Sequence, residues 1–338
     1  MTVLLTGATG LIGANLARRL AHEGSRPRLL VRLQSNRRAL AGFGFEESLG
    51  DILDLNSLRK AMGGVSEVYH LAASIRQDPA SASGTRRVHV DGTRNVMQAA
   101  RAAGVRRVLY VSGTAAIGPG TMSEPSTEAT PYRPDAANAY QETKREAEEL
   151  ALAGSGADFE VVVANPSYTV GAYDARPSSG RILLFVARNL VKLYPTGGTN
   201  YVAAADVAKG LALVMAKGRA GERYILGGEN LTHLQFLTLC AEEAGVAPPS
   251  LPLPEGLASR LAKLGDRVGG VAPGFLRSIN SATLAALYRP AYYSSQKAAR
   301  ELGYQPGPVR AGVREGYRWF QEEGFLPRGH TLAPRHAA

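Results

Sequence analysis

Apolar positions in the first 165 residues follow two alternating periodicities. Short runs rich in leucine and β-branched residues recur between longer segments whose apolar residues repeat every three or four positions. The first pattern is typical of buried strands and the second of amphipathic helices. Strands are expected at about 2–5, 28–31, 46–49, 65–73, 107–112 and 159–164, and helices from 11 to at least 20 and at about 54–62, 86–103 and 137–153. This alternation predicts an α/β fold, a doubly wound parallel sheet of the Rossmann type.

The pattern changes after residue 165. Loops rich in proline, glycine and serine, at 177–180, 195–200 and 248–256, separate helices from isolated short strands. We therefore expect a Rossmann domain over 1–165 and a smaller lobe over 166–325 that covers the carboxyl ends of the strands. A segment at about 201–227 could return to the main sheet. Residues 326–338 lack periodicity, which predicts a disordered tail.

Composition and charge narrow the class of protein. The hydrophobic fraction of 45% is ordinary for a soluble chain, and no basic leader or membrane-length apolar run is evident. The single cysteine, Cys240, excludes an internal disulfide and a cysteine-built metal site, and its apolar helical surroundings predict a core position. The net charge of +10 comes from scattered arginines, which favours a basic surface over a nucleic-acid site. A cytoplasmic enzyme is the expectation.

The first candidate site is the glycine-rich loop between the first strand and the first helix. Gly7 permits a tight turn, Gly10 leaves room for a pyrophosphate, and Gly13 lets the helix pack close to the sheet. The helix N-terminus adds free N–H groups and a partial positive charge. We therefore expect a dinucleotide to bind at Gly7, Thr9, Gly10, Leu11, Ile12 and Gly13.

Residues after the second and third strands bear on the choice of cofactor. A carboxylate after the second strand would accept a hydrogen bond from a free ribose hydroxyl, but this chain has Arg32, followed by Arg37 and Arg38. Arginine suits a bidentate grip on phosphate, so we predict NADP rather than NAD. Asp51 is expected to accept from the adenine amino group and Ile52 to pack on the ring.

Tyr140 and Lys144 form the second candidate site. Four residues apart on a helix, they share a face, and the ammonium would lower the pKa of the phenol. Such a tyrosine can donate a proton to a carbonyl oxygen during reduction. Ser112 and Thr114 follow the fifth strand, where hydroxyls face the ligand crevice, and Thr114 is expected to bind the substrate oxygen.

Together these motifs resemble the extended short-chain dehydrogenase/reductases of the NAD-dependent epimerase/dehydratase superfamily. The resemblance covers nearly the whole chain and includes the motifs at 50–52, 70–73, 91–96 and 165–167. It implies that Tyr140 is the acid/base, that Lys144 holds the nicotinamide ribose, and that Thr114 orients the substrate. It also implies further cofactor contacts from Leu71, Ala72, Ala73, Ser112, Pro166 and Ser167, and substrate contacts from Ser74, Ala115, Tyr168 and Arg181.

Segments at 177–182, 221–230 and 298–304 are similar to dihydroflavonol 4-reductase-like proteins, and closer still to a subgroup called hopanoid-associated sugar epimerases. The chain departs from its relatives at two places. His89 stands where many relatives have asparagine, and Ala203, Ala204 and Ala205 replace a polar stretch before Asp206. His70 is not expected to act as a second acid.

The leading hypothesis is an NADP-dependent reductase of a ketone or aldehyde on a small organic substrate. A nucleotide-sugar epimerase or dehydratase is the main alternative, and it would need cations such as Arg181, Arg188 and Lys192 for a diphosphate. Ala115 and Ala116 stand where a dehydratase would place acid/base residues. A non-catalytic NADP-sensing module is the third possibility. The resemblance implies a homodimer that pairs through the helices at 86–103 and 137–153.

Overall fold

The computed structural model describes residues 2–74, 81–132, 139–268 and 287–327. Within them, seven strands form one parallel sheet in the order β10-β6-β5-β4-β1-β2-β3. Their bounds are β1 (Val3–Thr6), β2 (Arg28–Val31), β3 (Glu46–Leu49), β4 (Glu67–His70), β5 (Arg107–Val111), β6 (Glu160–Pro166) and β10 (Arg223–Leu226). The order reverses between β1 and β4, which creates the crevice where ligands of such sheets bind. The expected α/β fold is confirmed.

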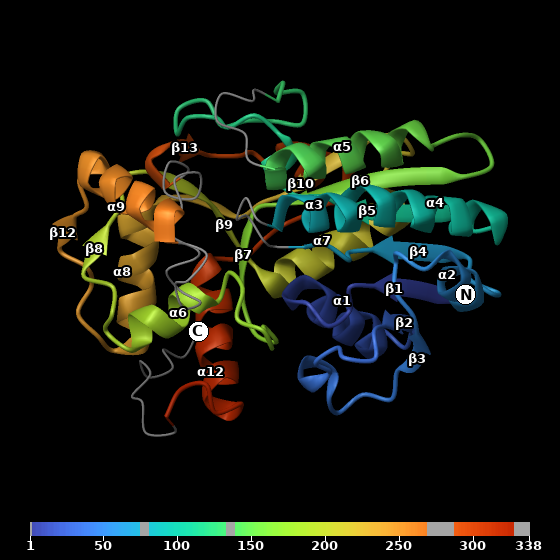
Figure 1. Ribbon diagram of the computed structural model, residues 1–338, viewed down its shortest axis with the longest axis horizontal. Coiled ribbons are helices and arrows are strands. Elements are labelled where there is room, and N and C mark those ends of the chain that lie inside the picture. The colour runs from blue at the N-terminus through green and yellow to red at the C-terminus, as the bar shows by residue number, and fades with distance from the viewer. Residues whose placement is uncertain (1, 75–80, 133–138, 269–286, 328–338) are drawn as a thin grey trace.

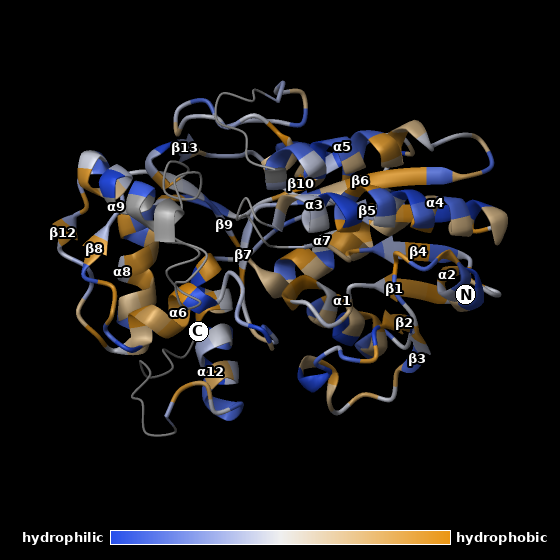
Figure 2. Cartoon of the chain, viewed as in Figure 1, coloured by the Kyte–Doolittle hydropathy of each residue, from blue (hydrophilic) through white to orange (hydrophobic). Residues whose placement is uncertain are grey.

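Helices cover both faces of this sheet (Figure 1). One face carries α1 (Leu11–His22) and α7 (Ala204–Lys217), and the other carries α2 (Leu55–Ala61), α4 (Gly92–Ala102) and α5 (Ala139–Ala153). The central strands are mostly apolar (Figure 2) because successive side chains enter opposite cores, as Leu4 and Leu5 do. The edge strand β3 is largely polar and exposed. The helix expected at 86–103 begins earlier, since α3 (Ala82–Arg86) and a π-helical turn, η3 (Arg87–Asp91), lead directly into α4.

A smaller lobe lies beside the carboxyl ends of the strands (Figure 1). Its helices are α6 (Arg181–Ala187), α8 (His233–Ala244), α9 (Glu255–Val268), α11 (Gln296–Leu302) and α12 (Val309–Glu322). One small sheet centres on β9 (Gly198–Ala203), which pairs with β7 (Tyr168–Val170), β11 (Glu229–Thr232) and β13 (Pro290–Ala291). A second pairs β8 (Leu193–Tyr194) with β12 (Leu251–Pro252). Cys240 is fully buried in α8.

Two features of the second half refine the expected boundaries. The segment suggested to return to the main sheet supplies α7 and then β10, which pairs with β6 at the edge of the sheet. The expected start of the tail at residue 326 is wrong, because Leu326 is 2% exposed and its N–H donates to the carbonyl of Phe320. An apolar side chain next to Phe320 stays in the core. Residues 328–338 of that tail lie outside the described residues.

Candidate active site

The glycine loop joins β1 to α1, and glycine is suited to each of its three positions for a different physical reason. Gly7 has φ +74°, and a Cβ there would lie 2.6 Å from the backbone nitrogen of Ala72. A Cβ on Gly13 would lie 2.2 Å from the carbonyl oxygen of Gly7. Backbone atoms cannot give way as a flexible side chain can, so both positions require glycine to close the turn and seat the helix.

Gly10 is different, because the protein itself leaves space beside it. A Cβ there would meet only the carbonyl oxygen of Gly7, at 3.5 Å. Gly10 is exposed and caps α1, and no side chain caps the first N–H groups of the helix. An open cradle at the positive end of a helix fits a pyrophosphate. Thr9 and Ile12 are half-buried beside it, whereas Leu11 is buried.

The arginines after β2 divide into two kinds. Arg37 donates from Nε to the carboxylate of Glu47 at 2.9 Å, and Arg38 pairs with Glu323. Arg32 is exposed at the end of β2, and among the described residues its guanidinium forms no ion pair. Its backbone N–H donates to Ser35 Oγ, which fixes the turn. Arg32 is therefore the arginine that remains available to a ribose phosphate, while Glu47 already neutralises Arg37.

Asp51 and Ile52, the two residues expected to contact adenine, lie in the turn after β3 and differ in their exposure and contacts. Asp51 is half-buried and accepts the N–H of Leu53 through Oδ1. Ile52 is 6% exposed and lies against Gly92, where a Cβ would come within 2.5 Å of its Cδ1. The Ile52 side chain thus packs between the turn and α4, and its contact with the adenine ring stays a prediction.

The end of β4 is tied to the glycine loop by hydrogen bonds. Leu71 N–H donates to the Thr6 carbonyl at 3.2 Å, and Ala72 N–H donates to Thr6 Oγ1 at 3.3 Å. His70 is fully buried, with Nδ1 2.7 Å from Thr6 Oγ1 and Nε2 3.2 Å from Thr93 Oγ1. Burial lowers the pKa of His70 to about 3, so the ring is neutral. It braces the loop rather than facing substrate. Ala73 is exposed at the crevice.

Hydroxyl groups follow the end of β5, as the sequence analysis expected. Ser112 is 7% exposed and its backbone N–H donates to the Ala164 carbonyl. Thr114 begins the short helical turn η4 (Thr114–Ala116), and Ala115 beside it is half-buried. Tyr293, a buried lobe residue, lies near Thr114, and burial raises the pKa of its hydroxyl while Thr114 opposes the shift. The lobe therefore brings a buried phenol close to the threonine expected to orient substrate.

Tyr140 and Lys144 lie on α5, which packs against η4. Lys144 is 2% exposed, and its Nζ donates to the carbonyl of Val111 at 3.0 Å. Burial lowers the pKa of Lys144 to about 8, although the carboxylate of Glu148 opposes the shift. Burial also raises the pKa of Tyr140. The expected lowering of the tyrosine pKa by lysine is therefore not found, because the ammonium is directed to the end of β5.

His89, whose role the sequence left open, connects the turn after β4 to α5. Its Nε2 lies 2.9 Å from the carbonyl oxygen of Ser74, and its Nδ1 lies 2.9 Å from Thr143 Oγ1. The imidazole also meets the ring of Tyr140 edge-on, with centroids 5.4 Å apart. Burial, and to a smaller degree the Lys144 charge, lower the pKa of His89 to about 3. A neutral imidazole thus fixes the helix that carries Tyr140.

The end of β6 joins the sheet to the lobe. Asn165 donates through Nδ2 to the Gly113 carbonyl at 3.1 Å and to the carboxylate of Glu148 at 2.7 Å. Ser167 donates from Oγ to Asn200 Oδ1 at 2.7 Å. The buried Glu148 also pairs with Arg223 at 3.0 Å. Glu148 and Asn200 carry no sequence motif, and only the tertiary contacts reveal them.

The polar groups of the residues expected near substrate after β6 form hydrogen bonds with the protein backbone. Pro166 ends the strand and is buried. Tyr168 is 39% exposed, and its hydroxyl donates to the Ser179 carbonyl. Its ring packs edge-on against Tyr201. Arg181 is half-buried, and its guanidinium donates to the Pro177 carbonyl. The surface beside the expected nicotinamide end is therefore partly aromatic.

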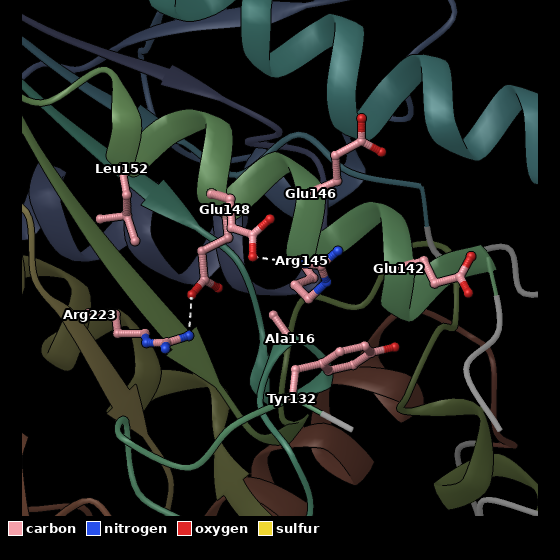
Figure 3. A pocket seen from close by; sticks show the side chains of 9 residues that line it. Ala116, Tyr132, Glu142, Arg145, Glu146, Glu148, Leu152 and Arg223 are labelled. Atoms are coloured by element: carbon pink, nitrogen blue, oxygen red, sulfur yellow. Dashed lines mark hydrogen bonds and ion pairs between the residues drawn. The ribbon is translucent and has the colours of Figure 1, made fainter. Parts of the chain in front are cut away.

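A pocket of about 690 Å³ opens on another side of α5. Figure 3 shows its charged wall, where Arg145 and Arg223 lie among the glutamates of α5. Its lining includes neither the glycine loop nor Tyr140, Lys144 or Thr114. The pocket therefore lies outside the crevice described above. In the described part of the chain, no group of histidine, cysteine and carboxylate side chains is arranged to hold a metal. No helix of these residues is long and apolar enough to cross a membrane.

Comparison with known proteins supports this geometry. The model of the NAD dependent epimerase/dehydratase family matches residues 3–227. The chain is 35% identical to sterol demethylase protein B of Methylococcus capsulatus, over 96% of this chain and all of that one. It is 30% identical to a Synechocystis protein provisionally named dihydroflavonol 4-reductase, over 95% of each. The crystal structure of gox2253 superimposes with a TM-score of 0.84 at 35% identity, covering 96% of this chain and 98% of that one.

These matches extend over both the sheet and the lobe. The expected resemblance to extended short-chain dehydrogenase/reductases, with members similar to dihydroflavonol 4-reductase, is confirmed. The group is made up of NAD(P)-dependent oxidoreductases, epimerases and dehydratases, and the open glycine cradle is where this chain would hold such a cofactor. The chain belongs to the NAD-dependent epimerase/dehydratase family and is an NAD(P)-dependent enzyme of the extended short-chain dehydrogenase/reductase type.

Proposed function

We propose that the protein is an NADP-dependent reductase of a ketone or aldehyde, with Tyr140 as the proton donor. The observation that carries the proposal is the convergence of α5 and β5. Lys144 Nζ reaches the Val111 carbonyl at the end of β5, and Thr114 follows in the turn that packs on α5. This convergence supports a site in which a phenol, an ammonium and a hydroxyl meet at the carboxyl edge of the sheet.

The chemistry of these groups suits reduction. The bound dinucleotide would supply hydride to the carbonyl carbon. Burial keeps the Tyr140 hydroxyl protonated, so it can give its proton to the carbonyl oxygen. The Lys144 ammonium, at the end of β5, would hold the nicotinamide ribose. Thr114, close to Tyr293, would orient the substrate oxygen.

The free arginine after β2 supports NADP over NAD. Arg32 lies at the end of β2, where a ribose phosphate would meet it, and Arg37 and Arg38 already pair with carboxylates. A guanidinium exposed in this way gives a planar, bidentate contact for phosphate.

The lobe offers weaker support for a nucleotide-sugar substrate. Arg181 donates to the Pro177 carbonyl, Arg188 to the Phe325 carbonyl, and Lys192 to the Asn189 amide oxygen. Arg181 is thus half-buried and held by a carbonyl of its own segment, whereas Arg188 and Lys192 are exposed cations of the surface. The names of the two relatives, a sterol demethylase protein and a dihydroflavonol 4-reductase, favour an apolar ring-bearing substrate instead.

Two further expectations form part of the proposal. Two copies would pair through α4 and α5, which lie side by side on one face of the sheet (Figure 1). A cytoplasmic location follows from the composition of the chain. Light scattering on the purified protein measures the first expectation, and fractionation of the source cells measures the second.

The test is consumption of NADPH with a panel of apolar ketones and aldehydes. Replacement Tyr140→Phe should lower kcat by about a hundredfold or more, since general acid catalysis contributes at least that much. Tyr132→Phe is the matched control, because Tyr132 lines the pocket on the other side of α5. Substrate interconversion without net NADPH consumption would favour an epimerase. Equal turnover in Tyr140→Phe and the parent would reject the role of Tyr140 and favour a sensing module.

A further inference from the structure

Large apolar side chains are exposed together at the outer end of the lobe. Leu190, Leu193, Leu251 and Leu257 are 64, 43, 60 and 48% exposed. They make up four of the eight large hydrophobic side chains exposed among the described residues. Strands β8 and β12 carry two of them, at the end of the molecule opposite the N-terminal strands (Figure 1). We call these four leucines the lobe tip.

The backbone sets the lobe tip in place. Strands β8 and β12 are parallel and pair Leu193 with Leu251, so both side chains point to the same face of this two-stranded sheet. Leu190 follows the end of α6, where Asn189 has φ 57° and Leu190 N–H donates to the Phe185 carbonyl. An apolar residue at that position of a helix end usually packs back on the helix. Here it stays exposed.

Positive charge predominates in the two segments that carry these leucines. Arg188 and Lys192 flank Leu190 and are exposed, and so are Arg260 and Lys263 on α9. Residues 188–194 and 251–263 together hold these four cations and one carboxylate, Glu255. The whole chain holds 39 lysines and arginines against 29 acidic residues. The excess of positive charge is therefore much greater at the lobe tip than over the protein as a whole.

We propose that the lobe tip binds the surface of a membrane rich in anionic lipid. Leucines that enter the interface, with cations among them that meet phosphate headgroups, match the chemistry of such a surface. Charge argues against a second copy of the same patch, because four cations would face four cations. Two short segments with four exposed leucines also offer little of the roughly 1,000 Å² that a stable protein interface buries.

Binding of this kind is peripheral and reversible. The leucines lie on short strands and helix ends, so they reach only the interfacial layer. None of the lobe-tip residues belongs to the catalytic constellation, and the proposal stands apart from the reaction assigned above. Binding would bring the lobe, which lies beside the crevice, to the surface of the lipid layer.

The test is co-sedimentation of the full chain with vesicles of phosphatidylcholine alone or mixed with phosphatidylglycerol. The parent should bind the mixed vesicles, and added salt should weaken the binding. The double variant Leu193→Ser/Leu251→Ser should bind less, and Lys192→Glu/Arg260→Glu should lose about fivefold or more for each charge. The control Leu49→Ser/Met122→Ser changes residues of similar exposure elsewhere, and Arg59→Glu/Lys60→Glu changes charges on α2. Both controls should bind like the parent.

Circular dichroism and NADPH turnover without vesicles establish that each variant is folded. The proposal is overturned if the parent binds neither kind of vesicle, or if lobe-tip and control variants lose binding equally. It is also overturned if light scattering finds that the lobe tip joins two copies, with the larger species lost in Leu193→Ser/Leu251→Ser. Such outcomes leave the reductase assignment untouched, because turnover is measured separately.

Discussion

The glycine loop and the lobe hold their parts of the crevice in different ways. At the loop, backbone lies against backbone, and a single added carbon at Gly13 would come within 2.2 Å of the Gly7 carbonyl. In the lobe, side chains reach across the sequence, and Asn200 alone bonds to Ser167, Gly228, Asn230 and Tyr293. The close backbone packing of the loop restricts which residue can stand at a position, so it produces a recognisable glycine pattern in the sequence. The lobe contacts join residues far apart in the chain and produce no such sequence pattern.

Replacement Gly13→Ala should have the largest effect. Its Cβ would meet backbone that cannot move, so the free energy of unfolding should fall by about 3 kcal/mol or more and NADPH binding should be lost. Urea unfolding and fluorescence titration with NADPH measure the two effects. Gly10→Ala is the control, because its Cβ has room and only the cofactor site should suffer. Equal loss of stability in both variants would contradict the different roles given to these glycines.

Replacement Asn200→Ala should have an intermediate effect. Asn200 is 1% exposed, and its loss leaves the Gly228 N–H and the Ser167 hydroxyl without their acceptor. Unpaired buried groups should lower the free energy of unfolding by about 2 kcal/mol, as urea unfolding measures. Because Asn200 also bonds to the Tyr293 carbonyl, KM for the carbonyl substrate should rise while the dissociation constant of NADPH stays the same. If the dissociation constant of NADPH rose as much as KM, the result would contradict the separate roles of the loop and the lobe.

Replacement Arg32→Ala should have the smallest effect on the fold and a selective effect on the cofactor. The side chain is exposed and forms no ion pair within the described residues, so stability should stay within about 0.5 kcal/mol. The ratio of kcat/KM for NADPH to that for NADH should fall by about tenfold, because a charge-assisted contact to phosphate is lost. Arg38→Ala is the comparison, since Glu323 already pairs with that arginine. A parent that uses both cofactors equally would reject the assignment.

The sequence predicted the parts held by local contacts better than the parts held by contacts between distant residues. The strands and helices of the sheet lie within a few residues of the predicted bounds. The segment at about 201–227, suggested as a return to the sheet, supplies α7 and β10. The contacts of His89 with Ser74 and Thr143 could not be predicted, because residues 54 positions apart meet only after α5 packs on η3. The packing of Ile52 against Gly92 could not be predicted either, because the two residues meet only when α4 folds onto the sheet.

The sequence by itself determined the class of the protein. The periodicity of the strands and helices, the glycines at 7, 10 and 13, and the spacing of Tyr140 and Lys144 are local patterns that local sterics impose. The tertiary structure decided the state of the site. It half-buried Tyr140 and raised its pKa, and it directed Lys144 to the Val111 carbonyl. It also paired Arg37 with Glu47 and left Arg32 with no ion pair among the described residues. Desolvation and ion pairing depend on what surrounds a side chain, and residues from many places in the chain make up those surroundings.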